Sequence, residues 1–290
     1  MQKVLITGCA GFIGHHLARK LTGMGYDTVG IDNLTTGLRR YSDLVNDFIW
    51  DDVGYLTAED LKGFDWVFHL AAQPSIPISI AEPMRTNDVN INQTLSLLIA
   101  ARDAGVKKFI FSSSSSVYGG QKKYPSNEED RVVPLTPYAL QKLTAEMYCE
   151  VFRTIYGLPT VSLRYFNVFG EEQRADNPYT GVLTKFLRMK NLGHPLTIFG
   201  DGTQTRDFTY IDDVISANLI TAESGEGVYN VGTGRNVSVN EIATAISDQV
   251  EYLPARPGDP MTSLADNGKL RELGWSPETE ILTWLNSQLN

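Results

Sequence analysis

Cysteine is almost absent from this sequence, with only Cys9 and Cys149 among 290 residues. Two cysteines cannot build the disulfide framework of a small secreted protein, so the composition indicates a reducing compartment, and we expect a cytoplasmic protein. Histidine is also scarce, and the four histidines form no cluster with cysteine at metal-ligand spacing. The sequence therefore predicts no metal site.

Long apolar runs and an excess of basic residues are missing as well. No run approaches the eighteen or so apolar residues of a membrane span, and the first run, "VLITG", is too short for the core of a signal peptide. Acidic residues outnumber basic ones by 34 to 25, for a formal net charge of −9. A general nucleic-acid surface needs clustered Lys and Arg, so we expect neither nucleic-acid nor membrane binding.

The first half of the chain alternates short apolar runs with longer stretches of helical spacing. This alternation predicts an α/β fold, a doubly wound parallel sheet of the Rossmann type. Beyond about residue 170 the rhythm breaks, which predicts a smaller C-terminal α/β domain that binds the substrate. We place the division between 1–166 and 167–290, with 206–232 returning to the first domain. Strands are expected at 3–7, 27–32, 65–72, 107–112 and 159–167, and helices at 12–25, 90–105, 136–157, 212–223 and 239–249.

A glycine pattern, "TGCAGFIG", joins the first strand to the first helix. Gly8 permits a tight turn, Gly11 lets the backbone approach a pyrophosphate, and Gly14 lets the helix pack closely on the sheet. Asp32 ends the second strand, where a carboxylate can accept hydrogen bonds from an adenosine ribose. Because that carboxylate would repel a 2′-phosphate, the pattern predicts NAD rather than NADP. A purely structural turn is the alternative for the glycines alone.

The best candidate base lies on the long helix, where "YALQK" places Tyr138 and Lys142 four residues apart and so on one face. A nearby ammonium and a positively charged nicotinamide would both lower the pKa of the phenol. Tyr118 and Lys122 show the same spacing, but they lie in "YGGQK", whose paired glycines argue against a helix. An ordinary pair on a solvated helix face is the alternative for Tyr138.

The stretch "FSSSSSVYGG" (111–120) places five serines directly after a buried strand. In a parallel sheet, residues that follow a strand lie at the carboxyl edge, where ligands of open α/β sheets bind. We therefore interpret the tract as part of an active-site wall rather than as a linker.

Together these motifs resemble the extended short-chain dehydrogenase/reductases, and most of all their UDP-glucose 4-epimerase branch. The resemblance runs from residue 3 to about residue 285. It is carried by "TGCAGFIG" (7–14), "DNL" (32–34), "HLAAQ" (69–73), "SSSSSVYG" (112–119), "PYALQK" (137–142), "RYFNVFG" (164–170) and "TRDFTYIDDV" (205–214).

The resemblance implies roles for individual residues. It implies that Ser114, Tyr138 and Lys142 are catalytic. The cofactor residues it implies are Gly8, Gly11, Phe12, Ile13, Gly14, Asp32, Asn33, Asp52, Val53, Leu70, Ala71, Ala72, Asn90, Ser112, Tyr138, Lys142 and Tyr165. The substrate residues it implies are Ser114, Asn167, Val182, Phe199, Arg206, Arg256, Asp259 and Ser263.

The tract also differs from relatives that dehydrate or decarboxylate. Those relatives carry an acidic residue just before "VYG", where this chain has Ser115 and Ser116. The resemblance therefore implies 4-epimerisation of a UDP-hexose through a 4-keto sugar, with NAD held as a prosthetic group. The alternatives are a uronate epimerase or decarboxylase on the same scaffold, and a non-catalytic NAD-binding regulator.

Two finer expectations follow from the resemblance. Ser263 falls where epimerases restricted to UDP-glucose carry a tyrosine, so we expect N-acetylated UDP-hexoses to be accepted as well as plain ones. The helices at 90–104 and 137–156 carry apolar residues on more than one face, and relatives pair such helices, so we expect a homodimer.

Overall fold

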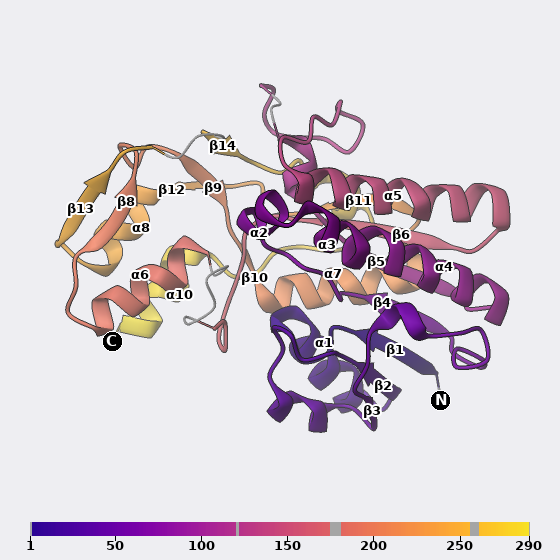
Figure 1. Cartoon of the computed structure of the whole chain (residues 1–290). Coiled ribbons are helices and arrows are strands. Elements are labelled where there is room, and N and C mark those ends of the chain that lie inside the picture. Colours follow the sequence, from indigo (N-terminus) through magenta and orange to yellow (C-terminus); the bar gives the residue numbers. More distant parts are fainter. Residues whose placement is uncertain (1, 120–121, 175–180, 256–260, 290) are drawn as a thin grey trace.

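A computed structural model describes residues 2–119, 122–174, 181–255 and 261–289. Its main feature is a seven-stranded sheet in the order β11-β6-β5-β4-β1-β2-β3, in which every neighbouring pair is parallel (Figure 1). The strands are β1 (Lys3–Thr7), β2 (Asp27–Ile31), β3 (Asp47–Ile49), β4 (Trp66–His69), β5 (Lys108–Ser114), β6 (Thr160–Tyr165) and β11 (Gly227–Val231). The predicted doubly wound parallel fold is confirmed.

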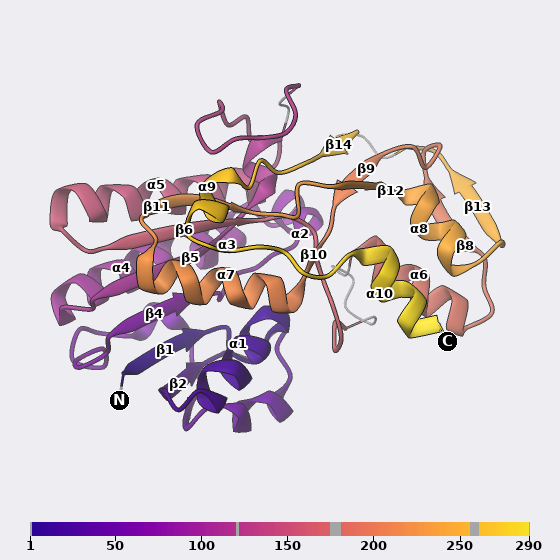
Figure 2. The ribbon, with the colours of Figure 1, turned by 180° about the vertical axis from the view of Figure 1, so that it is seen from behind.

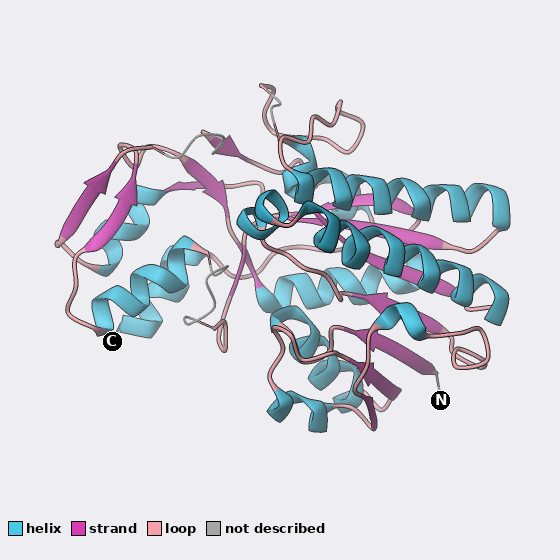
Figure 3. Cartoon of the chain, in the orientation of Figure 1, coloured by secondary structure: helices cyan, strands magenta, loops and turns pink. Residues whose placement is uncertain are grey.

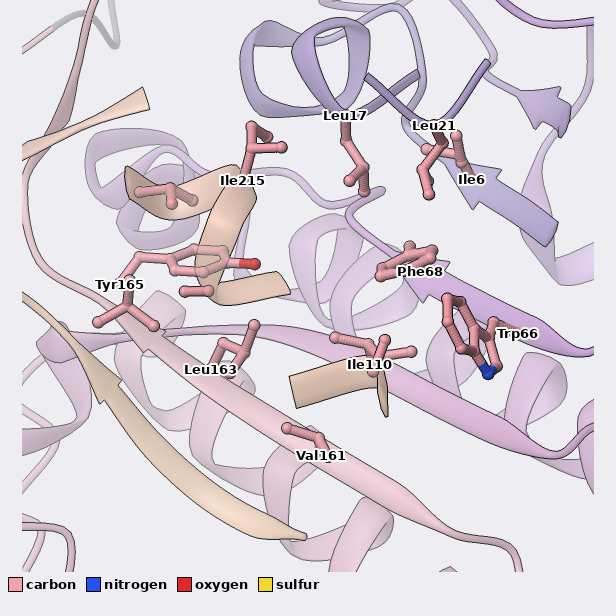
Figure 4. Packing of buried hydrophobic residues seen from close by; sticks show 14 of the residues in the cluster. Ile6, Leu17, Leu21, Trp66, Phe68, Ile110, Val161, Leu163, Tyr165 and Ile215 are labelled. Atoms are coloured by element: carbon pink, nitrogen blue, oxygen red, sulfur yellow. The ribbon is translucent and has the colours of Figure 1, made fainter. Parts of the chain in front are cut away.

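The central strands are apolar along their whole length because helices cover both faces of the sheet. On one face, α1 (Phe12–Gly23) and α7 (Ile211–Ser224) pack against each other and on the sheet, as Figure 2 shows. Figure 4 shows this core from close by, with Leu17 of α1 and Ile215 of α7 above Phe68 and Leu163 of the sheet. These side chains are fully or almost fully buried, and the apolar area that they remove from water stabilises the layer.

The opposite face is covered by α4 (Gln93–Ala104) and α5 (Pro137–Tyr156), in front of the sheet in Figure 1. The α5 helix begins at Thr136, whose hydroxyl accepts a hydrogen bond from the N–H of Ala139, with Pro137 at its first position. It ends at Gly157, whose φ of 69° is the left-handed conformation that closes helices. Local capping therefore sets the position of Tyr138 and Lys142.

The helix expected at 90–105 is longer and less regular than its pattern predicts. It begins as α3 (Pro83–Asn87), passes through a π-helical turn, η3 (Asp88–Asn92), and continues as α4. The short helix α2 (Ile76–Ala81) precedes it, and three 3₁₀ turns, η1 (Arg39–Leu44), η2 (Val53–Tyr55) and η4 (Ser115–Tyr118), complete this part of the chain. A π-turn inserts one residue into the helix, often at a functional site.

The C-terminal part forms a smaller α/β body beside the carboxyl edge of the sheet (Figures 1 and 3). Its own core joins Phe186, Ile198, Ile242 and Trp284. Its helices are α6 (Val182–Asn191), α8 (Val239–Ile246) and α10 (Ile281–Leu289), whereas α9 (Gly268–Glu272) lies near β11. Its short strands are β7 (Val168–Phe169), β8 (Leu196–Phe199), β9 (Thr205–Asp207), β10 (Thr209–Tyr210), β12 (Asn236–Ser238), β13 (Val250–Leu253) and β14 (Thr262–Ser263).

The chain crosses between the two bodies more than once. After β6 it enters the smaller body, and α7 and β11 then return to the large sheet. The boundary at residue 166 stays a prediction, because the crossings leave no single point of division. None of the helices in the described ranges has the length and apolar character needed to cross a bilayer.

Candidate active site

A cavity of about 910 Å³ opens at the carboxyl edge of the large sheet and extends to the smaller body. It is lined by twenty of the residues expected to bind cofactor or substrate. These are Gly8, Gly11, Phe12, Ile13, Gly14, Asp32, Asn33, Asp52, Val53, Leu70, Ala71, Ala72, Ser112, Ser114, Tyr138, Lys142, Tyr165, Asn167, Arg206 and Ser263.

Three of the expected site residues that the structure describes are not on this lining. Asn90, Val182 and Phe199 lie elsewhere in the described chain. Arg256 and Asp259 fall outside the described residues. The roles assigned to these five residues stay predictions.

The glycine turn after β1 has the shape that a dinucleotide diphosphate requires. Gly8 has a φ of +67°, and an added Cβ would lie 2.8 Å from the backbone nitrogen of Ala71. An added Cβ at Gly14 would collide with the carbonyl oxygen of Gly8. The α1 helix begins at Gly11 without a side-chain cap and without an acidic residue in its first turn. Its N–H groups can therefore bind an anion at this end of the cavity, which fits a pyrophosphate.

Asp32 is held rigidly beside this turn. Its carboxylate accepts hydrogen bonds from the N–H groups of Ala10, at 3.0 Å, and of Leu34, at 2.7 Å. Burial raises the pKa of Asp32, and the two backbone donors oppose that rise. Asn33 donates to the carboxylate of Asp52 at 2.6 Å, which joins the ends of β2 and β3. Each oxygen of Asp32 keeps further acceptor capacity for a ribose hydroxyl.

The candidate catalytic group is built where β5 meets α5. The Tyr138 phenol lies beside the hydroxyl of Ser114, and its backbone N–H donates to the hydroxyl of Ser79 at 3.1 Å. Burial raises the pKa of Tyr138 to about 12, and the Ser114 hydroxyl works against this rise. The protein alone therefore holds a neutral phenol, and positive charge brought into the cavity would lower its pKa.

Lys142 lies one helical turn after Tyr138 and is 3% exposed. Its ammonium donates to the carbonyl oxygen of Ser112 at 2.7 Å and lies 4.9 Å from the ring centre of Phe111. Burial lowers the pKa of Lys142 to about 7. Lys142 can therefore gain or lose its proton near neutral pH. Its bond to Ser112 holds the amine behind the cavity wall that Tyr138 also lines.

Two buried groups hold the loop after β4 against the cavity. The hydroxyl of Thr7 accepts from the N–H groups of Leu70 and Ala71, both at 3.1 Å, and so donates its own proton to Nδ1 of His69 at 2.8 Å. Burial lowers the pKa of His69 to about 3, so this ring is neutral. His69 then donates from Nε2 to Thr94 at 2.8 Å.

Asn90, in the π-turn, acts on the same loop from behind. Its side chain accepts from the backbone N–H of Gln73 at 2.8 Å and donates to the backbone carbonyl oxygen of the same residue at 3.1 Å. It also donates to the side-chain oxygen Oε1 of Gln141 at 2.8 Å. Gln73 itself lines the cavity. Asn90 therefore positions a lining residue from the layer behind the wall.

The substrate end of the cavity is formed by the crossing strands of the smaller body. Asn167 donates to the carbonyl oxygen of Asp207 at 2.9 Å, which fixes its amide beside β9. Arg206 of β9 and Ser263 of β14 are partners in the strand register, so both side chains lie at the same level of the cavity. The cavity thus runs from the glycine turn, past Tyr138, to a cationic and hydroxyl-bearing end.

Several lining residues have no local signal in the sequence. Tyr118 lies on the wall, but its hydroxyl donates to Asn230 and accepts from Arg164, both at 2.8 Å. Tyr41 and Gln73 also line the cavity. Their contacts join segments far apart in the chain, so spacing alone could not identify them.

This parallel sheet, with its glycine turn and its Ser–Tyr–Lys group at the end of the fifth strand, defines an extended short-chain dehydrogenase/reductase. The sequence matches the NAD-dependent epimerase/dehydratase family over residues 4–232, and the chain belongs to that family. Its family confirms the predicted NAD cofactor, which the glycine turn fits.

Individual relatives match nearly the whole chain. A UDP-glucose 4-epimerase of Mycolicibacterium smegmatis is 36% identical over 97% of this chain and 95% of its own. The structure of a UDP-N-acetylglucosamine 4-epimerase from Methanobrevibacter ruminantium, in complex with UDP-N-acetylmuramic acid, is 39% identical with a TM-score of 0.91 and covers 99% of both chains. A UDP-glucuronic acid 4-epimerase from Bacillus cereus, in complex with UDP-glucuronic acid and NAD, is 34% identical with a TM-score of 0.90 and covers 99% of this chain and 98% of that one. Relatives named as epimerases of three different UDP-sugars are thus about equally similar to this chain.

Proposed function

We propose that this protein catalyses the 4-epimerisation of a UDP-hexose, and that N-acetylated UDP-hexoses are substrates as well as plain ones. The observation that carries the proposal is that Ser114 and Tyr138 lie side by side in the cavity, with Lys142 directly behind. The wall next to this group continues with Ser115 and Ser116 rather than carboxylates. Such a wall supports proton and hydride movement but supplies no acid for elimination.

In the proposed reaction, the phenolate of Tyr138 takes the proton of the C4 hydroxyl while the C4 hydrogen leaves as hydride, so the C4–O single bond becomes a ketone. Bound NAD supplies the acceptor and later the donor of that hydride. Ser114 donates a hydrogen bond that holds the C4 oxygen beside the phenol. Lys142 contributes positive charge that favours the phenolate. After the 4-keto sugar turns over, hydride returns to its other face and Tyr138 returns the proton.

The expected acceptance of an acetamido group rests on Ser263. This serine borders the cavity beside Arg206, on a short strand that leaves its side chain partly exposed. A serine leaves space for a C2 substituent and offers a hydroxyl that can donate or accept. A bulky side chain at this position would narrow the same end of the cavity.

The substrate test uses three nucleotide sugars in separate reactions. The purified protein is incubated with UDP-glucose, UDP-N-acetylglucosamine and UDP-glucuronic acid, and the products are identified by proton NMR. The proposal expects C4 epimers from the first two. Conversion of UDP-glucuronic acid alone would favour the uronate alternative, release of carbon dioxide would favour a decarboxylase, and no conversion of any sugar would favour a non-catalytic role.

We further propose that the protein is a homodimer paired through α4 and α5. Four exposed apolar side chains recur along α5 at intervals of seven, four and four residues, the spacing of one helix face: Leu140, Met147, Val151 and Ile155. Ile99 on the neighbouring α4 is also exposed, at 40%. A charged side chain in this stripe would be buried by pairing, so Met147→Glu should give a monomer by light scattering. A monomeric wild-type protein would contradict the pairing.

A further inference from the structure

Two histidines and a glutamate meet at the edge of the cavity, away from Tyr138. His15 and His16 lie in the first half of α1, and Glu172 lies in the loop after β7. The Nε2 atom of His15 is 3.2 Å from Oε2 of Glu172, and that of His16 is 3.9 Å from the same oxygen. Among the described residues, these three are a set whose donor atoms all lie within 4.8 Å of one another.

The hydrogen bonds of the two rings determine what faces the carboxylate. Nδ1 of His15 lies 2.8 Å from the carbonyl oxygen of Gly11, and Nδ1 of His16 lies 3.0 Å from that of Phe12. A carbonyl oxygen can only accept, so each Nδ1 carries the hydrogen. In the neutral rings each Nε2 then presents a lone pair to Glu172. Lone pairs that face a carboxylate need a cation between them.

The protein fixes the position of the His15 ring. Its side chain is fully buried and stacks on Tyr41, with ring centres 3.9 Å apart. Among the described residues, Arg19 bonds the same carboxylate oxygen at 2.9 Å, and its side chain is 48% exposed. The Arg19 side chain can move to the second carboxylate oxygen or into solvent.

We propose that His15, His16 and Glu172 bind a divalent transition metal ion of the zinc type. Two imidazole nitrogens and a carboxylate oxygen are a common ligand set for Zn²⁺ and for its spectroscopic substitute Co²⁺. Bonds of about 2.0–2.1 Å in a tetrahedral site place ligand atoms about 3.3 Å apart. The 3.2 Å between His15 and Glu172 matches this separation, and the 3.9 Å between His16 and Glu172 would shorten when the ion binds. The carbonyl oxygens of Gly11 and Phe12 orient the rings in the way that outer partners orient metal-bound histidines.

The ion would link segments 157 residues apart. It would tie the loop after β7 to the helix whose first turn forms the glycine end of the cavity, since both His15 and Glu172 also line that cavity. The metal would therefore stabilise the closed edge of the cavity and take no part in the proton transfer at Tyr138. The spacing of histidine and cysteine, from which no metal was expected, does not include Glu172, which lies 157 residues after His15.

The test is metal binding by untagged protein that has been stripped with a chelator and freed of the chelator. Titration with Co²⁺, followed by visible absorption, should give one equivalent per chain with the intense bands of a site of four or five ligands. Zn²⁺ should displace this signal and raise the thermal midpoint. Glu172→Gln, which keeps the shape of the side chain, and His16→Gln should each weaken the affinity for Co²⁺ at least tenfold.

Two controls separate the site from general binding by surface groups. Glu171→Gln changes the neighbouring acid, which bonds Tyr210 and Trp284, and should leave the affinity unchanged. Arg19→Gln removes the competing cation and should leave the affinity unchanged or raise it. Circular dichroism confirms that each variant is folded. Wild-type protein that binds no stoichiometric ion, or ligand variants that keep wild-type affinity, would overturn the proposal.

Discussion

The most direct test of the site compares two tyrosines that share one cavity, Tyr138 and Tyr118. Tyr138→Phe removes only the phenolic oxygen, because the backbone bond to Ser79 and the packing of the ring remain. The loss of this hydroxyl, which lies beside Ser114, should cost at most the contribution of one hydrogen bond, about 0.5–1.5 kcal/mol, in folding stability. Removal of a general base should slow turnover about 10²–10⁴-fold, which corresponds to about 2.7–5.4 kcal/mol of transition-state stabilisation.

Tyr118→Phe is the matched control. Its hydroxyl accepts from the charged Arg164 and donates to Asn230, in a buried setting where burial raises the pKa of Tyr118 to about 12. A hydrogen bond to a charged group contributes about 1.5–3 kcal/mol, so this variant should lose more stability than Tyr138→Phe. It should lose less than tenfold in turnover, because its oxygen is committed to two protein partners.

The assay pairs initial rates, measured by NMR on the accepted UDP-sugar, with urea unfolding of the same samples. We expect the two variants to rank in opposite order in the two measurements. Turnover of Tyr138→Phe within tenfold of wild type would refute the assignment of the base. Equal rate losses in both variants would show that the rates report disturbance of the wall rather than proton transfer.

Three further outcomes are expected. Denatured wild-type protein should release NAD and not NADP, because the carboxylate of Asp32 repels a 2′-phosphate, and stoichiometric consumption of added NAD during turnover would contradict a redox-neutral cycle. Ser263→Tyr should abolish epimerisation of UDP-N-acetylglucosamine and keep that of UDP-glucose, whereas equal activity on both sugars would exclude Ser263 as the gate. Burial lowers the pKa of Lys142, so the unfolded chain binds this proton more tightly. The ligand-free wild type should therefore gain stability relative to Lys142→Met as the pH rises from about 7 to about 10, by at most about 1.4 kcal/mol per pH unit. Urea unfolding across that range measures the difference, and parallel curves would contradict the lowered pKa of Lys142.

Local signals were sufficient for the parts of the site that lie within one turn or one helix. Gly8 and Gly14 act within a single strand-to-helix turn, and Tyr138 and Lys142 lie one helical turn apart. The spacing of these residues in the sequence is enough to determine how they lie relative to one another. The same reasoning located β1, β2, β4, β5 and β6, because a buried parallel strand needs a continuous apolar run. It missed β3, which has three residues and is mostly exposed.

Contacts between distant segments could not be predicted in this way. The π-turn that brings Asn90 behind Gln73 leaves no mark in an apolar pattern that fits a regular helix. The approach of Glu172 to His15 depends on how the loop after β7 folds back onto α1. Each of these results from tertiary packing, which local periodicity does not encode.

The serine tract shows how one local pattern can serve several long-range contacts. Residues of a strand alternate between the faces of the sheet. Ser112 accordingly lies near Tyr165 on the face that α7 covers, and Ser113 donates to Glu146 of α5 at 2.8 Å on the other. Ser114, at the end of β5, lies beside Tyr138 and accepts from the N–H of Ser116 at 3.2 Å, which starts the η4 turn. A hydroxyl is short enough to pack in a strand and polar enough to bond on either face, so serine suits each position for a different reason.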